Sequence, residues 1–163
     1  MRRARASKSM RLEFSLPDAE ATLRLGAALA RGIGPGRVLH LKGDLGTGKT
    51  TLVRGLLRAL GHAGPVKSPS YSVVEPYTLS SLNLYHFDLF RIKDPQEWLS
   101  SGLREYFGPE AACIVEWPER AGTMLASPDL EARLDFQGEG RRAVLESATP
   151  SGDAWLSSLR SFS

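Results

Sequence analysis

The chain has 163 residues, of which 42% are hydrophobic and 24% charged, a composition typical of one soluble globular domain. It contains no run of about 18 apolar residues, which excludes a transmembrane helix. The net charge of +3 comes from the N-terminus, because five of the 21 Lys and Arg lie within the first 11 residues and the other 16 stand against 18 Asp and Glu. A broadly basic, nucleic-acid-binding body is therefore excluded too.

The composition also predicts where the domain begins and where the protein works. We expect residues 1–11 to be a basic, disordered tail and residues 12–163 to be a single domain. The tail has no apolar stretch behind its charges, so it is not a secretory signal. Cys113 is the only cysteine, which excludes an intramolecular disulfide and favours the reducing cytoplasm. No contact with a membrane is expected.

Strand and helix patterns alternate in the first half of the chain. Alternation and helix punctuation by Asp, Pro and Gly predict strand, helix, strand, helix and strand over residues 11–16, 17–34, 38–41, 49–61 and 71–77. In the first helix Leu23, Ala27 and Ala30 share one predicted apolar face. The second strand runs directly into a glycine-rich loop.

The second half continues with a strand over 82–92, a helix over 94–108 and a buried strand over 111–117. Two alternating strands, a hairpin joined at Gly138 to Gly140, and a short helix complete the series at residues 129–138, 141–149 and 153–162. These elements predict an α/β fold of the P-loop NTPase kind, a mixed β-sheet flanked by helices with a late antiparallel hairpin.

The glycine-rich loop has the residue spacing of a phosphate-binding loop. Gly43, Gly48, Lys49 and Thr50 satisfy G-x-x-x-x-G-K-[ST], between a predicted strand and a predicted helix. The glycines let backbone N–H groups point at phosphate oxygens, and the helix N-terminus adds its positive end. Lys49 supplies a charge for the β and γ phosphates, and the Thr50 hydroxyl can ligate Mg²⁺.

Two carboxylates stand where such a loop needs an acid. Asp88 and Glu116 end predicted strands, at the sheet edge where open α/β folds gather ligands. Alternation puts His86 on the face of Asp88, and Ile114 on the face of Glu116. One carboxylate can hold Mg²⁺ while the other orients water or a substrate hydroxyl, and spacing alone leaves both assignments open.

The segment Lys67 to Tyr71, KSPSY, lies where nucleotide-sensing switch loops occur, and Ser68 or Ser70 can reach the γ phosphate or the metal; a plain turn is the alternative.

A GTPase needs an Asn-Lys-x-Asp motif, and Asn83 is the only asparagine. The common GTPases are therefore excluded. Motor ATPases need further domains, which leaves a small-molecule kinase or a stand-alone regulatory ATPase.

GDLGTGKTT, VKSPSYSVVEPY, LYHFDLFRIKDPQEW, GLREYF and IVEWPER follow one another in an order and spacing that resemble the TsaE (formerly YjeE) family, over roughly residues 16 to 141. The resemblance implies a bacterial ATPase that works with TsaB and TsaD to make threonylcarbamoyladenosine next to the anticodon of ANN-decoding tRNAs. In this pathway TsaD transfers the threonylcarbamoyl group, and ATP drives or resets the complex. Contact with tRNA would be indirect.

The resemblance also assigns roles to single residues. It implies that Thr50 and Glu116 are the Mg²⁺ ligands, that Asp88 is needed for hydrolysis together with Lys49 and Glu116, and that Trp117 is a functional neighbour. The residues implied to contact ATP are Gly43, Asp44, Leu45, Gly46, Thr47, Gly48, Lys49, Thr50, Thr51, Ser70 and Arg141. Ser70 stands where the family usually has Thr, and Phe90 replaces the usual Tyr.

We expect slow hydrolysis by the isolated protein, because the sequence has no obvious built-in arginine finger. Arg91 is the best internal candidate, and a partner contact is the alternative. Two other functions remain: a kinase for a small hydroxyl substrate with Asp88 as base, and a non-hydrolytic module that binds TsaB and TsaD when nucleotide is bound.

Overall fold

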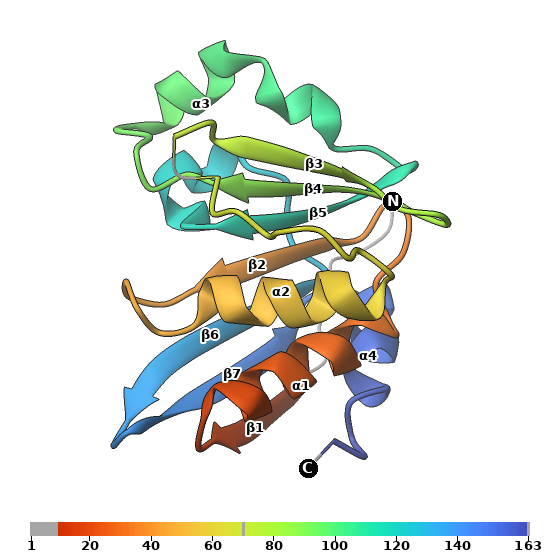
Figure 1. Ribbon diagram of the computed structural model, residues 1–163. Helices are drawn as coiled ribbons and strands as arrows, with labels where there is room; N and C mark the ends of the chain where they lie inside the picture. Colours follow the sequence, from red (N-terminus) through yellow and green to blue (C-terminus); the bar gives the residue numbers. More distant parts are fainter. Residues whose placement is uncertain (1–9, 70, 163) are drawn as a thin grey trace.

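A seven-stranded sheet forms the centre of the structure, a computed structural model that describes residues 10–69 and 71–162 (Figure 1). The strand order is β1-β7-β6-β2-β5-β4-β3. The strands are β1 (Arg11–Leu16), β2 (Val38–Lys42), β3 (Val74–Thr78), β4 (Asn83–Asp88), β5 (Ala111–Glu116), β6 (Leu130–Gln137) and β7 (Gly140–Ser147). The β6, β2, β5 and β4 neighbours pair in parallel, and the outer pairs are antiparallel. The predicted mixed sheet and late hairpin are confirmed.

Helices cover both faces of this sheet. They are α1 (Ala19–Ala30), α2 (Lys49–Ala59), α3 (Pro95–Ser101) and α4 (Pro150–Ser157), with 3-10 turns η1 (Leu103–Tyr106) and η2 (Pro118–Met124). α1 and α2 lie side by side on one face (Figure 1). Asp18, Asp94 and Thr149 cap α1, α3 and α4 by accepting backbone N–H bonds of 2.9, 3.1 and 2.9 Å. No helix in the described part of the chain is long and apolar enough to cross a membrane.

Alternation along the central strands divides the core between the two faces. Leu39 and Ile114 pack toward α1 and α2, whereas Val38 and Cys113 pack toward α3 and the 3-10 turns. In α1 the buried stripe is Ala21, Leu25, Ala28 and Leu29. The predicted face of Leu23, Ala27 and Ala30 is wrong in register, because Leu23 and Ala27 are only half-buried and the helix turns Leu25 and Leu29 fully inward.

Two predicted elements are longer than those in the structure. β4 ends at Asp88 and does not reach residue 92, because the Asp88 carboxylate accepts the Phe90 N–H and turns the chain. The helix predicted over 94–108 is α3 followed by η1, because Gly102 between them has a left-handed backbone with φ of 75°. The strand predicted over residues 11–16 is β1, so Arg11, which was also counted in the predicted tail, belongs to the sheet. Residues 1–9 lie outside the described part of the chain.

α1 and α2 approach each other through glycines. A Cβ at Gly26 would lie 2.1 Å from the Leu52 carbonyl oxygen, and one at Gly55 would lie 2.2 Å from the Leu23 carbonyl oxygen. Only residues without a Cβ permit this separation of the two helices. The contact fixes the N-terminal turn of α2, which follows the glycine-rich loop, beside the start of α1.

Candidate functional site

The loop between β2 and α2 has a backbone that depends on glycine. Gly43 has φ of 145°, and a Cβ there would lie 2.5 Å from the Leu134 carbonyl oxygen. Gly48, the N-cap of α2, has φ of 105° and supplies no side-chain cap. The first N–H groups of α2 are therefore available to an anion, as the sequence pattern predicts.

Lys49 opens α2 and is 6% exposed. Its Nζ donates to the Gly43 carbonyl oxygen and lies 4.2 Å from the centroid of the Trp117 ring. Burial lowers the pKa of Lys49, and the carboxylates of Glu116 and Asp88 oppose that effect. Trp117, whose ring lies beside the Lys49 ammonium, has a left-handed backbone with φ of 56°. This conformation is rare for a bulky residue, and such strained residues cluster at functional sites.

Asp88 and Glu116 are direct partners in the parallel pairing of β4 and β5, and they are 5% and 3% exposed. Both strands end at these residues, so the two carboxylates meet beside the glycine-rich loop. Oδ1 of Asp88 accepts the Phe90 N–H at 2.9 Å. Burial raises the pKa of Asp88, the Phe90 N–H lowers it, and Glu116 raises it further. A carboxylate with a raised pKa is better suited to accept a proton near neutral pH.

His86 makes a buried bond to Glu116. The imidazole Nε2 lies 2.6 Å from Glu116 Oε2, and the two side chains are 0% and 4% exposed. His86 and Asp88 lie on one face of β4, as predicted, with Glu116 and Ile114 on the same side of β5. Sequence reasoning placed His86 on this face but gave it no role.

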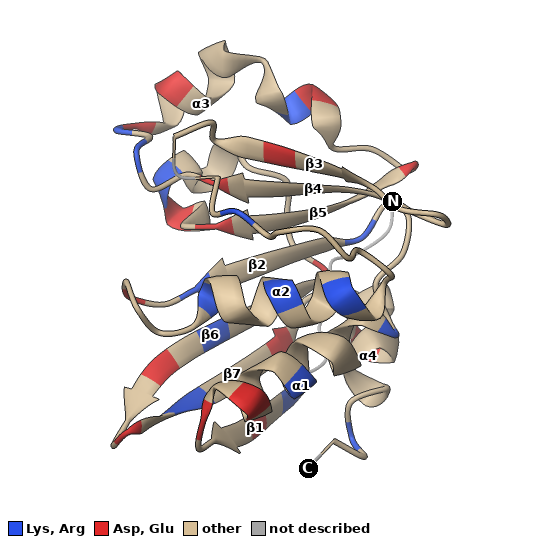
Figure 2. Ribbon diagram, viewed as in Figure 1, with Lys and Arg blue, Asp and Glu red and all other residues tan. Residues whose placement is uncertain are grey.

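These side chains surround a cavity of about 270 Å³, here named the phosphate cavity. Its lining is Leu45, Gly46, Gly48, Lys49, Thr50, Thr51, Ser68, Asp88, Glu116 and Trp117. Figure 2 shows acidic residues at the ends of β4 and β5 and a basic residue in the first turn of α2. Ser70, the other predicted switch-loop residue, lies outside the described part of the chain.

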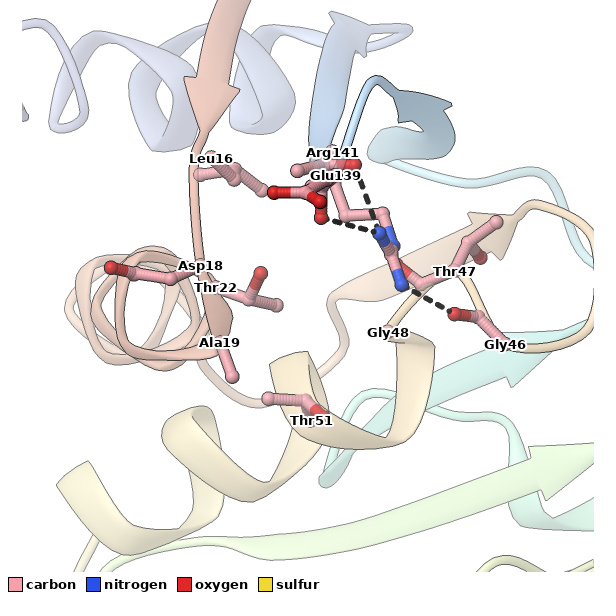
Figure 3. A pocket seen from close by; sticks show the side chains of 11 residues that line it. Leu16, Asp18, Ala19, Thr22, Gly46, Thr47, Gly48, Thr51, Glu139 and Arg141 are labelled. Carbon is pink, nitrogen blue, oxygen red and sulfur yellow. Dashed lines mark hydrogen bonds between the residues drawn. The ribbon is translucent and has the colours of Figure 1, made fainter.

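A second cavity of about 170 Å³, here named the hairpin cavity, lies on the other side of the same loop (Figure 3). It is lined by Leu16, Asp18, Ala19, Thr22, Gly46, Thr47, Gly48, Thr51, Glu139, Gly140 and Arg141. Gly46, Gly48 and Thr51 line both cavities. A ligand that follows the loop therefore passes from one cavity to the other.

Arg141 connects the hairpin to the glycine-rich loop. Its guanidinium donates to the carbonyl oxygens of Gly46 at 3.1 Å (Figure 3) and Thr47 at 3.2 Å. The guanidinium also stacks on Phe136, 4.6 Å from the ring centroid. Arg141 therefore lies at the glycine-rich loop. Arg91 is not one of the described residues that line the phosphate cavity. Arg91 stacks on Tyr71, 4.3 Å from its ring centroid, on the exposed surface.

Sequence reasoning missed Asp18, Thr22 and Glu139. Asp18 was identified only as helix punctuation, and nothing in the local sequence places it near residue 139. The pairing of β1 with β7 and of β7 with β6 brings the start of α1 and the hairpin together. No cluster of three or more His, Cys, Asp or Glu suited to a metal ion occurs in residues 10–69 and 71–162.

The chain is similar to known proteins over most of its length. The family model for "Threonylcarbamoyl adenosine biosynthesis protein TsaE" matches residues 16–144. The tRNA threonylcarbamoyladenosine biosynthesis protein TsaE of Haemophilus influenzae is 40% identical over 122 residues, 75% of this chain and 77% of that protein. The protein of the same name from Bacillus subtilis is 37% identical over 127 residues, 78% of this chain and 77% of that protein. The crystal structure of Bacillus subtilis YdiB superimposes with a TM-score of 0.81 and 26% identity, covering 94% of this chain and 97% of that one.

Proposed function

Because this chain belongs to the TsaE family of threonylcarbamoyl adenosine biosynthesis proteins, we propose that it is a Mg²⁺-dependent ATPase acting with TsaB and TsaD. ATP binding and hydrolysis would drive or reset the complex that modifies the adenosine next to the anticodon of ANN-decoding tRNAs. One observation carries the proposal: a lysine from α2 and carboxylates from β4 and β5 converge on a single cavity at the glycine-rich loop.

The phosphates of ATP would lie in the phosphate cavity. N–H groups of the loop and of the first turn of α2 would donate to the α and β phosphates. Lys49 would exchange its bond to the Gly43 carbonyl for one to the β and γ phosphates, a stronger, charge-assisted bond. Burial strengthens this attraction, because the Lys49 ammonium is already removed from most of its water.

The nucleoside would extend into the hairpin cavity, which shares part of its lining with the phosphate cavity. Thr51 lies at the junction, where the α phosphate would pass. Arg141 would shape this end of the site by holding the Gly46 and Thr47 carbonyls away from the phosphates. Its role is therefore to order the loop beside the nucleotide.

Asp88 would act as the base in hydrolysis. It lies at the end of β4 in the wall of the phosphate cavity, and its burial raises its pKa toward the range where a carboxylate accepts a proton from water. The Phe90 N–H fixes Oδ1, which limits rotation of the carboxylate. General base catalysis contributes about 10² to 10⁴-fold to a rate, so loss of Asp88 should be felt in turnover more than in binding.

Thr50 and Glu116 would hold Mg²⁺. Both line the phosphate cavity, and a hydroxyl with one carboxylate is a donor set that suits Mg²⁺, which keeps several waters and binds substrate phosphates. When bound, the ion neutralises charge on the β and γ phosphate oxygens.

The partner complex would supply what the chain itself lacks at the γ phosphate. Among the described residues, Lys49 is the only cation that lines the phosphate cavity. An arginine donated in trans is worth about 10³ to 10⁵ in rate for related phosphoryl transfers. We therefore expect slow hydrolysis by the isolated chain and a marked increase when TsaB and TsaD are added.

The central experiment is tRNA modification by TsaB and TsaD with and without this protein, supplied with ATP or with a non-hydrolysable analogue. Multiple turnover with ATP alone supports a hydrolysis-driven cycle. Equal modification with the analogue points to the non-hydrolytic binding module, and ADP release that requires an added small hydroxyl compound points to the kinase. No effect of the protein under any condition contradicts the proposal.

Single substitutions separate binding from hydrolysis. Lys49→Ala should weaken ATP binding, because it removes the phosphate-facing charge. Asp88→Ala should bind fluorescent ADP as the natural protein does and lose about 10² to 10⁴-fold in turnover. Normal hydrolysis by Asp88→Ala would show that another group accepts the proton.

A further inference from the structure

His86 is a buried polar group that the proposed reaction leaves without a task. It lies in β4, two residues before Asp88, and is 0% exposed. Its Nε2 bond to Glu116 Oε2, at 2.6 Å, runs diagonally across the parallel pair β4 and β5, since His86 stands opposite Ile114 in the register. Its Nδ1 is buried and has no hydrogen-bond partner among the described residues. The imidazole therefore makes its one polar contact with Glu116.

The chemistry of that contact gives the bond its direction. Carboxylate oxygens accept hydrogen bonds and a ring N–H donates them, so Nε2 of His86 is the donor and Oε2 of Glu116 the acceptor. The bond constrains Glu116 at Oε2 and leaves Oε1 as the oxygen that can turn toward the phosphate cavity. Asp88 also accepts a hydrogen bond from the protein, from the Phe90 N–H to Oδ1.

We propose that His86 is a positioning residue that holds Glu116 in the orientation needed to ligate Mg²⁺. This inference rests on the proposed nucleotide site. Partners that orient metal ligands are worth about 10 to 100-fold in metal affinity or activity. A lysine or arginine in the same place would add a fixed positive charge beside the ion, whereas the imidazole orients Glu116 by a hydrogen bond from one edge of the ring. His86 would not touch ATP.

Three variants test the bond itself. His86→Leu removes the donor, His86→Gln places an amide N–H near the position of Nε2, and His86→Asn places it near Nδ1, too far from Glu116. We expect His86→Leu and His86→Asn to need about 10 to 100-fold more Mg²⁺ for half-maximal ATP hydrolysis, with His86→Gln close to the natural protein. The affinity for fluorescent ADP without Mg²⁺ should change little in all three, because no nucleotide contact is lost.

His40→Gln is the matched control. His40 is also a buried strand histidine, but its bond is to the Ala126 carbonyl on the opposite face of the sheet. Its substitution should leave the Mg²⁺ requirement unchanged. A natural Mg²⁺ requirement in His86→Leu, or equal defects in the Leu and Gln variants, would overturn the positioning role.

Wild-type protein labelled with ¹⁵N-histidine gives a second reading that does not require a folded His86 variant. The chain has three histidines, so His40→Gln and His62→Gln assign the third signal by elimination. Adding Mg²⁺ to the ADP-bound protein should shift the Nε2 resonance of His86, and an unmoved resonance would refute the inference. Natural protein that neither binds ADP nor needs Mg²⁺ contradicts the proposed function instead.

Discussion

His40 should make the stability of this fold sensitive to acid. The side chain is 7% exposed in β2, and burial lowers its pKa from 6.5 to about 4. Glu131 and the Ala126 carbonyl act in the opposite direction, and Lys42 adds to the lowering. Because the folded pKa lies below the unfolded value, the unfolded chain binds a proton that the folded chain refuses between those pH values.

The magnitude follows from the interval between the two pKa values. His40 contributes its full stability above pH 6.5 and loses it as the pH falls toward 4, at about 1.4 kcal/mol per pH unit. At pH 4.5 the loss should be about 2.5 kcal/mol relative to pH 7.5. His40→Gln does not titrate and keeps an amide that can donate to Ala126, so it should lack this component.

Urea unfolding of the natural protein and of His40→Gln at pH 7.5 and pH 4.5, followed by tryptophan fluorescence, measures the difference. Comparing the two proteins cancels the contributions of other acidic groups, Asp88 among them. We expect the natural protein to lose about 2.5 kcal/mol more than the variant between the two pH values. Equal losses would refute the burial argument for His40.

Gly26→Ala should lower the free energy of unfolding in urea by about 1 to 3 kcal/mol, because the new Cβ would lie 2.1 Å from a carbonyl oxygen of α2. Gly34→Ala is the control: its Cβ meets nothing within 4 Å, so the free energy of unfolding should change by no more than about 0.5 kcal/mol. Cys113 is 1% exposed and burial raises its pKa to about 12, so Ellman's reagent should label it only when urea unfolds the protein; rapid labelling of native protein would contradict this. Trp155→Phe removes the 2.9 Å bond to the Leu29 carbonyl and should cost about 1 to 3 kcal/mol in thermal unfolding, beyond any change in packing.

The parts of the site that the sequence predicted are those encoded locally. The spacing from Gly43 to Thr50 specifies a loop and the helix after it, and the strand patterns were enough to place Asp88 and Glu116 toward the carboxyl ends of their strands. The hairpin cavity was not predicted, because it depends on which strands become neighbours. Asp18, the N-cap of α1, and Glu139 of the hairpin line one cavity only because the antiparallel pairs at that edge bring the two segments together.

The sequence also could not predict which face of α1 is buried or where β4 ends. The helix pattern of residues 17–34 is rich in alanine, so several faces of α1 are almost equally apolar. The close approach at Gly26 selects among them, and that contact involves a residue of α2. Likewise, the apolar run continues past Asp88, and only the bond from Phe90 to its carboxylate shows where β4 ends.

The place of β2 in the sheet has a consequence for synthesis of the chain. β2 carries the glycine-rich loop, yet its partners are β5 and β6, which pair Val38 with Cys113 and Leu39 with Leu130. Such long-range parallel pairing forms late and slowly. A nascent chain on the ribosome therefore carries the whole loop motif long before it has a site. Nucleotide in the cell should not speed folding at that stage, because the binding site has not yet formed. Once β6 and β7 have been added to the sheet, bound nucleotide should stabilise the folded state.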